Sequence, residues 1–208
     1  MNLLILGPQA SGKGTQAKRI AKELGIPHIS TGDIFRDNIE RGTDLGKKVL
    51  MIQGGELVPD ELTNSIVKNR LKQEDCANGY ILDGYPRNLV QAEYLNSISQ
   101  IDAVIDLEVP TKVIMERITS RRACGDCKAD YNIIYMKPKQ EGICDKCEGE
   151  LIQRKDDTPG PIKKRLDIYY SQTQPLISFY KEQGVSLKEI DGVGTPGEIL
   201  DRIMNVLR

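Results

Sequence analysis

Short apolar runs alternate with stretches of helical spacing along most of the chain. The run Asn2–Leu6 is ended by Gly7, which predicts a strand buried on both faces. From Gly12 to Leu24 the apolar residues share one helical face, and Gly25 provides the stop. The pattern recurs later, with strands expected at Tyr80–Leu82, Ala103–Val109 and Val185–Ile190, and helices at Pro110–Arg122 and Pro196–Leu207. This alternation predicts an α/β fold in which helices cover both faces of a parallel sheet.

Two stretches depart from this rhythm. Residues from about 30 to 58 look helical throughout and contain several glycines, whereas residues from about 122 to 161 have little helical period and hold four of the five cysteines. We interpret both as insertions on one core. The expected core domain comprises 1–29, 59–121 and 160–208, with a first insertion at 30–58 and a second at 122–159.

The segment GPQASGKGT follows the first predicted strand and opens the first predicted helix, which is the context of a P-loop. Its glycines let backbone amides surround phosphate oxygens at the start of a helix, while Lys13 adds a full charge. The strict pattern has Ser or Thr directly after the lysine. Here Gly14 intervenes and the hydroxyl expected near magnesium belongs to Thr15. The lysine and its context make an ordinary glycine-rich turn the weaker interpretation.

Asp83 follows the strand predicted at Tyr80–Leu82. An aspartate at a strand end is usually a turn residue. In this fold class it would lie beside the phosphate loop, at the carboxyl edge of the sheet. We therefore interpret Asp83 as a partner for Mg²⁺, bound through water.

Composition and charge narrow the function classes. The chain of 208 residues carries 29 Lys and Arg against 30 Asp and Glu, and this balance lacks the basic excess expected of a dedicated nucleic-acid binder. No targeting segment or run of membrane-spanning length is evident. The expected location is therefore cytoplasmic, with no membrane partner and a monomer as the default. In the cytosol paired cysteines favour metal over disulfides, and Cys76 is interpreted as a small buried or half-buried thiol.

The spacing Cys-x2-Cys-x16-Cys-x2-Cys predicts a closed, structural zinc site formed by Cys124, Cys127, Cys144 and Cys147. Iron is a minor alternative. Tyr131 and Tyr135 lie among lysines between the two pairs, a mixture that could stack and hold single-stranded RNA. We prefer the simpler interpretation of a small hairpin whose side chains pack on one another around the metal.

The acceptor of a phosphoryl group can be inferred from the charged residues. A phosphate acceptor is already ionised and needs cations, not a base, because two anions must be brought together. Arginines occupy distinctive positions at turns and insertion boundaries, namely Arg36, Arg87, Arg121, Arg122, Arg154 and Arg165. The single histidine, His28, lies in an apolar context and is interpreted as structural.

Seven segments occur in the order seen in adenylate kinases of the bacterial, zinc-containing, long-lid type: GPQASGKGTQA, STGDIFR, GELVPDEL, LDGYPRN, RRACGDC, RKDD and TQPLISFY. The resemblance covers essentially the whole chain. It implies the reaction ATP + AMP = 2 ADP with Mg²⁺, on a P-loop core that carries an AMP-binding insertion (30–58) and a zinc-stabilised lid (122–159). It also implies ATP, AMP and ADP as the partners, without nucleic acid.

Functional residues follow from the resemblance by position. It implies that the donor phosphates are held by Ala10, Ser11, Gly12, Lys13, Gly14 and Thr15. It implies further ATP contacts from Arg117, stacked on adenine, from Arg121 of the lid and from the backbone of Gly194. The implied AMP site consists of Thr31, Arg36, Glu56, Leu57, Val58, Gly84, Tyr85, Pro86, Arg87, Gln91, Arg154 and Arg165. Within it, Arg87 binds the AMP phosphate and Gln91 reads the adenine. The implied catalytic cations are Lys13, Arg87, Arg121, Arg154 and Arg165.

One departure and three rival functions accompany this resemblance. The family usually has glycine where this chain has Ala10, and a Cβ there strains the loop if the backbone angle φ is positive. The nearest rival is a kinase for UMP, CMP or GMP, which Thr31 and Gln91 disfavour. A nucleic-acid-binding protein with a vestigial nucleotide site predicts salt-sensitive RNA binding. A nucleotide-dependent switch predicts slow hydrolysis without transfer to AMP.

Overall fold

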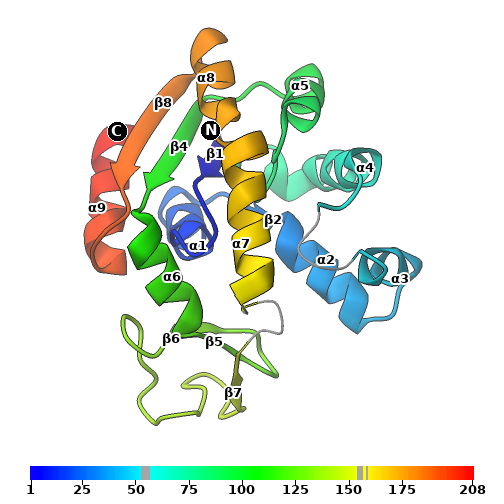
Figure 1. Ribbon diagram of the computed structural model, residues 1–208. Coiled ribbons are helices and arrows are strands. Elements are labelled where there is room, and N and C mark those ends of the chain that lie inside the picture. Colours follow the sequence, from blue (N-terminus) through cyan, green and yellow to red (C-terminus); the bar gives the residue numbers. More distant parts are fainter. Residues whose placement is uncertain (53–56, 154–156, 158) are drawn as a thin grey trace.

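A five-stranded parallel sheet forms the centre of the protein in a computed structural model, which describes residues 1–52, 57–153, 157 and 159–208 (Figure 1). The strand order is β2-β3-β1-β4-β8. The strands are β1 (Asn2–Leu6), β2 (His28–Ser30), β3 (Tyr80–Asp83), β4 (Ala103–Glu108) and β8 (Ser186–Asp191). The predicted α/β class and parallel sheet are confirmed. Strand β2 was not predicted from the sequence, because three residues are too few to show a period.

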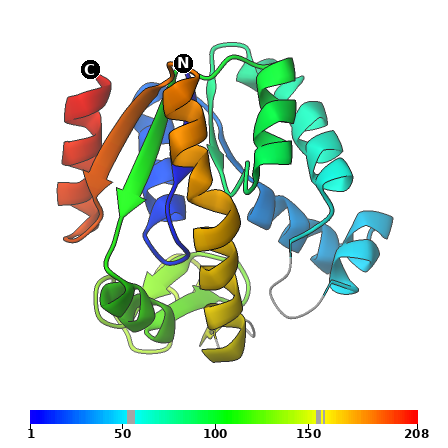
Figure 2. The ribbon, with the colours of Figure 1, turned by 45° about the horizontal axis from the view of Figure 1, so that its top comes forward.

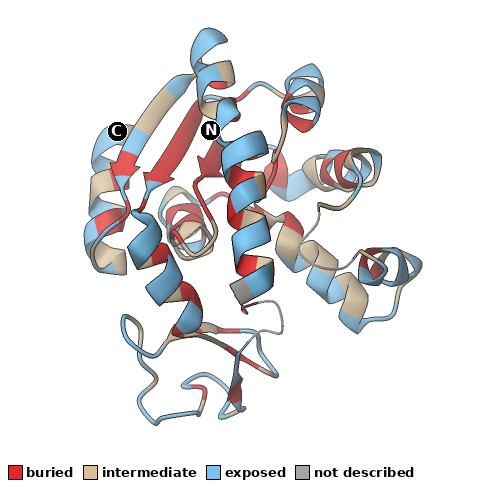
Figure 3. Ribbon diagram, in the orientation of Figure 1, coloured by how far each residue is buried: buried red, intermediate tan, exposed pale blue. Residues whose placement is uncertain are grey.

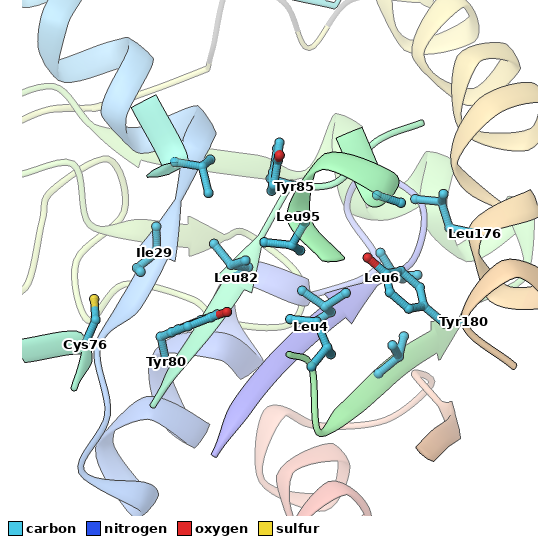
Figure 4. Packing of buried hydrophobic residues seen from close by; sticks show 14 residues of the cluster. Leu4, Leu6, Ile29, Cys76, Tyr80, Leu82, Tyr85, Leu95, Leu176 and Tyr180 are labelled. Carbon is cyan, nitrogen blue, oxygen red and sulfur yellow. The ribbon is translucent and has the colours of Figure 1, made fainter. Parts of the chain in front are cut away.

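Side chains of β1 alternate between two cores. Leu3 and Ile5 pack with α1 (Lys13–Leu24) and α9 (Pro196–Leu207) on one face. Leu4 and Leu6 pack on the other face with α4 (Asp60–Leu71), α5 (Leu89–Ile98) and α8 (Pro175–Glu182) (Figures 3 and 4). Each fully buried leucine or isoleucine contributes roughly 1.5–3 kcal/mol of transfer free energy. Burial on both faces explains why this strand is apolar without alternation.

The first insertion is helical in its described part. Helix α2 (Thr31–Glu40) begins where Ser30 accepts a hydrogen bond from the Asp33 amide. Helix α3 (Asp44–Leu50) is capped in the same way by Thr43. The two helices approach so closely that a Cβ on Gly46 would lie 2.1 Å from the Asn38 carbonyl oxygen. Figure 2 shows the pair at one side of the sheet, next to α4.

The second insertion is a small antiparallel sheet with the order β6-β5-β7. Its strands are β5 (Arg121–Cys124), β6 (Asp130–Asn132) and β7 (Leu151–Ile152). The prediction of a helix over Pro110–Arg122 was wrong at its end, because α6 covers Thr111–Thr119 only. The Ser120 hydroxyl donates to the Glu116 carbonyl and accepts from Asn132, and from there the chain pairs with β6. Pairing within the lid thus overrides the helical spacing.

A long helical rod crosses the molecule in front of the sheet (Figure 1). It consists of α7 (Pro159–Ile168), a π-helical turn (Tyr169–Thr173) and α8. Pro175 has no amide proton to donate to the carbonyl of residue 171. The Gln174 amide instead donates to the Tyr169 carbonyl five residues back, at 2.8 Å. The short 3₁₀ helix Glu74–Cys76 leads into β3 and buries the Cys76 thiol, as expected.

Asp106 is a buried carboxylate near the end of β4. It is 4% exposed, and its Oδ1 has no hydrogen-bond partner in the described part of the chain. Burial raises the pKa of Asp106 to about 6, with a further contribution from Glu108 and Glu189. Because the folded pKa lies above the ordinary 3.8, the folded state binds more protons than the unfolded chain between these values. Stability therefore falls as pH rises through this window.

We expect Asp106→Asn to raise the free energy of unfolding by about 2–3 kcal/mol at about pH 7.5, because the penalty of the buried charge disappears. At about pH 4, where the folded carboxyl is protonated, the gain should be much smaller. Urea unfolding at the two pH values measures the difference. Glu93→Gln removes an exposed carboxylate on α5 and is the matched control. A gain of equal size at both pH values would contradict the explanation.

Candidate active site

A cleft of about 410 Å³ opens at the carboxyl edge of the parallel sheet. Its walls come from the loops after β1 and β3, from both insertions and from the π-helical turn. Figure 2 shows β4 and β8 running toward the end of the molecule at which the lid lies. Ligands of open α/β sheets bind at this edge, because the loops there can diverge and leave a crevice.

The phosphate loop joins β1 to α1 along one wall of the cleft. Gly12 has a φ of 101° and directly precedes the first helical residue, Lys13, so that the loop passes into a helix N-terminus. Ala10 has a φ of 57°, which is the conformation that the sequence analysis identified as straining a non-glycine residue. A left-handed residue with a Cβ costs on the order of 1–2 kcal/mol. Ser11 is fully buried, and its hydroxyl has no partner among the described residues.

The Lys13 ammonium lies over the loop from which it projects. Its Nζ donates to the carbonyl oxygens of Gly7 at 2.6 Å and Pro8 at 2.7 Å. Burial lowers the pKa of Lys13 to about 8, although the Asp83 carboxylate opposes this effect. An ammonium whose charge is poorly compensated attracts a phosphate anion, whose binding would restore the ordinary pKa.

Asp83 ends β3 and lines the cleft beside the loop, where a Cβ on Gly14 would lie 3.3 Å from its Oδ2. Burial alone would raise the pKa of Asp83, but a hydrogen bond from His28 and the charge of Lys13 outweigh burial, and the net shift is downward. The carboxylate is therefore anionic, as a hard divalent cation requires. His28 Nε2 lies 3.3 Å from Asp83 Oδ2. His28 was interpreted from the sequence as structural, because strand β2, which brings it beside Asp83, was not predicted.

Five of the arginines named from the sequence converge on the cleft, namely Arg36, Arg87, Arg117, Arg121 and Arg165. Arg87 is held by its own Nε bond to the Gly84 carbonyl at 2.8 Å and by a bond from the Thr173 hydroxyl to the Arg87 carbonyl at 2.7 Å. Burial lowers the pKa of Arg87. Arg36 is more exposed and pairs with Asp33. The cluster gathers positive charge where two polyanions would meet.

Arg121 and Arg117 have different partners. Arg121 makes a bidentate ion pair with Asp157, whose side chain is 1% exposed. The Arg117 guanidinium donates to the carbonyls of Ser11 at 3.0 Å and Gly192 at 2.9 Å, and its Cζ lies 5.5 Å from the centre of the Tyr135 ring. Arg117 thus bridges the phosphate loop, the loop after β8 and the lid.

Several residues named from the sequence do not line the cleft. Thr31 is buried and donates to the Gly84 carbonyl at 2.9 Å, and the Tyr85 side chain belongs to the core. Gln91 is 2% exposed; its Oε1 accepts from the Arg87 amide at 2.8 Å and its Nε2 donates to Asp60 at 2.7 Å. Leu57, Gly84, Pro86 and Gly194 do line the cleft. Glu56 and Arg154 lie outside the described residues.

The lid contributes five cleft residues that were not assigned there from the sequence: Asp130, Tyr131, Asn132, Tyr135 and Met136. The same holds for Ile168, Tyr169 and Thr173 of the rod. The aromatic residues stood out in the sequence, but they were interpreted as hairpin packing or an RNA surface. The direction in which these side chains point depends on how the lid is attached to α6. The residue pattern does not predict that attachment.

The four clustered cysteines form a tetrathiol site at the turns of the lid. All four Sγ atoms lie within 4.8 Å of one another, with 3.4 Å between Cys124 and Cys147 and 3.5 Å between Cys127 and Cys144. Tetrahedral zinc with Zn–S bonds of about 2.3 Å separates sulfurs by about 3.8 Å, so the cluster fits this ion. The Tyr131 hydroxyl, as a hydrogen-bond partner, lowers the pKa of Cys144 to about 6. This favours the thiolate that a metal needs.

The apolar cluster within the lid is small. It consists of Cys124, Ala129, Tyr131, Cys144 and Leu151, two of which are themselves sulfur ligands of the proposed site. So small a cluster cannot stabilise a sheet of this size by burial alone. A metal cross-link would supply the stability that these apolar contacts lack.

Comparison with known proteins gives one consistent result. The family model for adenylate kinase matches residues 5–185. An adenylate kinase of Clostridium tetani is 51% identical over 100% of this chain and 98% of its own length. Adenylate kinases of Moorella thermoacetica (52% identical, 92% of this chain and 91% of that protein) and Caldicellulosiruptor saccharolyticus (49%, 100% and 98%) are similarly close. Separately, none of the described helices combines the length and apolarity needed to cross a bilayer.

Proposed function

The chain belongs to the adenylate kinase family, and we propose how its residues divide the work of ATP + AMP = 2 ADP. The reaction moves the γ-phosphoryl group of ATP to the phosphate of AMP. Such a transfer needs little covalent chemistry from the protein; it needs two anions held in line, their charge compensated, and water kept away. The residues of one cleft can meet these requirements.

The observation that carries the proposal is the meeting of a phosphate loop and five arginines around one cleft. On the donor side, the loop from Ala10 to Thr15 receives the ATP phosphates, with Lys13 as the principal cation. Arg117 and the backbone of Gly194 lie on the same side and take the donor base. On the acceptor side, Arg36 and Arg87 take the AMP phosphate. Arg121 and Arg165 face the space between the two.

No proton acceptor is needed for this transfer, because the attacking oxygen of AMP is already ionised. Adenylate kinases use Mg²⁺ with ATP, and the residues proposed to hold it are Asp83, through water, and the Thr15 hydroxyl. The ion supplies charge compensation on the donor phosphates. His28 orients Asp83 by its hydrogen bond and is not assigned a proton-transfer step.

The division into core, AMP-binding insertion (30–58) and lid (122–159) is part of the proposal. The lid brings Arg121 and Arg154 toward the phosphates, although Arg154 lies outside the described residues. The lid also excludes water that would otherwise accept the phosphoryl group. Zinc in the tetrathiol site stiffens the lid. A cytoplasmic monomer that binds small nucleotides and no nucleic acid remains the expected context.

A panel of acceptors tests the substrate assignment. With ATP and Mg²⁺, ADP formation should be fastest with AMP and far slower with UMP, CMP or GMP, and removal of Mg²⁺ should abolish it. Rates come from a coupled assay for ADP. Faster transfer to UMP or CMP would overturn the assignment to AMP, whereas ATP hydrolysis without transfer would favour a nucleotide switch.

Arg87→Ala tests the acceptor side. The guanidinium is buried and fixed, so its loss should raise the KM for AMP on the order of 10²-fold or more, consistent with the loss of a charge-assisted bidentate contact. The KM for ATP should change much less. Arg41→Ala, on an exposed arginine that pairs with Asp37 outside the cleft, is the matched control. An unchanged KM for AMP would remove Arg87 from the site.

A further inference from the structure

Strand β6 contacts three different parts of the molecule with three consecutive residues. Asp130 accepts from Lys18 of α1 at 3.1 Å. Tyr131 reaches Cys144 of the tetrathiol site with its hydroxyl, at 3.4 Å. Asn132 donates to the carbonyl of Arg117, at the end of α6, at 3.1 Å. This short strand, which lies next to the end of α6 in Figure 1, therefore joins the metal site to both walls of the donor half of the cleft.

The direction of the Tyr131 hydrogen bond follows from its other partner. The Asp145 amide donates to the Tyr131 hydroxyl oxygen at 2.7 Å, so the oxygen already accepts one hydrogen bond. The single hydroxyl proton is then available to Cys144 Sγ, and a metal-bound thiolate is a good acceptor for it. Both groups are shielded from water, because Tyr131 is 7% exposed and Cys144 is 1% exposed.

Tyr131 also belongs to the wall of the nucleotide cleft. Its partner in the β5–β6 ladder is Arg122, whose neighbour Arg121 pairs with Asn132 in the same ladder. A displacement of the Cys144 turn would move Tyr131, and with it the strand that positions Arg117 and Arg121. The hydrogen bond from Tyr131 to Cys144 links the tetrathiol site directly to this strand.

We propose that Tyr131 is a positioning residue that couples metal binding at the four cysteines to the donor half of the cleft. The bound metal fixes the position of Cys144, and the hydrogen bond from Tyr131 to Cys144 fixes the Tyr131 side chain. Strand β6 then keeps Arg117 and Arg121 in the positions that bind ATP. Acceptor binding is left largely untouched, because Arg36 and Arg87 lie on elements outside the lid. This coupling rests on the proposed function, in that it assigns the two halves of the cleft to ATP and AMP.

The first test measures metal release. Zinc-loaded Tyr131→Phe should transfer its zinc to a chromophoric chelator about tenfold faster than the parent, in line with the loss of an outer-shell hydrogen bond. Tyr135→Phe is the matched control, because it deletes another lid hydroxyl, which bonds to Glu116 at 2.9 Å and touches no cysteine. Release at the parental rate from Tyr131→Phe would overturn the proposal.

The second test measures binding of ATP alone and AMP alone by equilibrium titration. Tyr131→Phe should weaken ATP binding several-fold and leave AMP binding within about twofold. Removal of zinc from the parent should act in the same direction, and Tyr131→Phe should add little once the zinc is gone, because both act through one link. Independent, additive losses, or equal losses for ATP and AMP, would overturn it.

Two further measurements separate these outcomes from unfolding of the variant and from a failure of the proposed function. Melting curves and far-UV circular dichroism compare the variants, and if Tyr131→Phe does not fold, the metal-stripped parent alone decides through its ATP-to-AMP affinity ratio. The parental assay separates this inference from the proposed function. If the parent transfers phosphoryl groups to AMP normally while the coupling test fails, only the coupling is wrong.

Discussion

Replacing Lys13 with alanine is expected to lower kcat/KM for ATP by about 10³-fold while the protein stays folded. The ammonium is the one lysine of the phosphate loop, and it is held over the loop by the Gly7 and Pro8 carbonyls. It compensates charge that grows on the phosphates during transfer, and removing one such preorganised group typically costs 10²–10³-fold or more. Because Lys13 is already buried in the free protein, its charge stabilises the phosphates more strongly than the charge of an exposed cation would.

The control for this prediction is Lys22→Ala, which removes an exposed lysine from the last turn of the same helix. It should retain activity within about twofold. Initial rates of ADP formation and the melting temperature are measured for both variants. A Lys13→Ala variant with more than about a tenth of parental turnover would contradict the role given to this residue, as would a loss explained entirely by unfolding.

Cys144→Ser is expected to give the largest loss of stability. Three thiolates and a hydroxyl hold zinc far less well than four thiolates, so zinc content should fall below one ion per chain. A decrease of about 3 kcal/mol in the free energy of unfolding would lower the melting temperature by roughly 6–12 °C. This decrease is only a fraction of what structural zinc contributes in small domains. Turnover at low temperature and saturating ATP should change much less, because no cysteine belongs to the cleft wall and the coupling through Tyr131 acts on ATP affinity.

Metal analysis, melting curves and turnover at two temperatures check this expectation. Cys76→Ser is the matched control, since its thiol lies outside the cluster and receives a hydrogen bond from Arg70. It should retain the parental zinc content. If Cys144→Ser also retained its zinc, the assignment of the four cysteines as a metal site would be wrong.

Features that depend on local sequence were predicted well. The apolar run of β1 predicted a strand, and the glycines before Lys13 predicted a loop that passes into a helix. The two Cys-x-x-Cys pairs predicted a cluster of four cysteines. Each of these features depends on neighbouring residues alone. The parallel sheet followed from the order of these elements. The end of α6 was predicted wrongly because pairing with β6 ends the helix, and that partner lies a dozen residues further along.

The parts of the candidate site that could not be predicted depend on contacts between distant elements. His28 looked structural, yet the pairing of β2 with β3 brings its ring to Asp83. Asp157 gave no signal as the partner of Arg121, since 36 residues separate them. The positions of Tyr131 and Tyr135 in the cleft wall arise from the attachment of the lid to α6. Residue type suggested these groups, but only the packed fold decides which of them meet.

The π-helical turn at Tyr169–Thr173 sets the angular phase between the two halves of the long rod. If the same residues closed as an ordinary α-helix, every later side chain would swing by about 100° about the axis. Ile162 and Leu166 would keep facing α6, but Leu176 and Tyr180 would leave the sheet. The widened turn therefore lets a single rod pack against two separate interiors, whereas a regular α-helix of the same sequence could pack against only one of them.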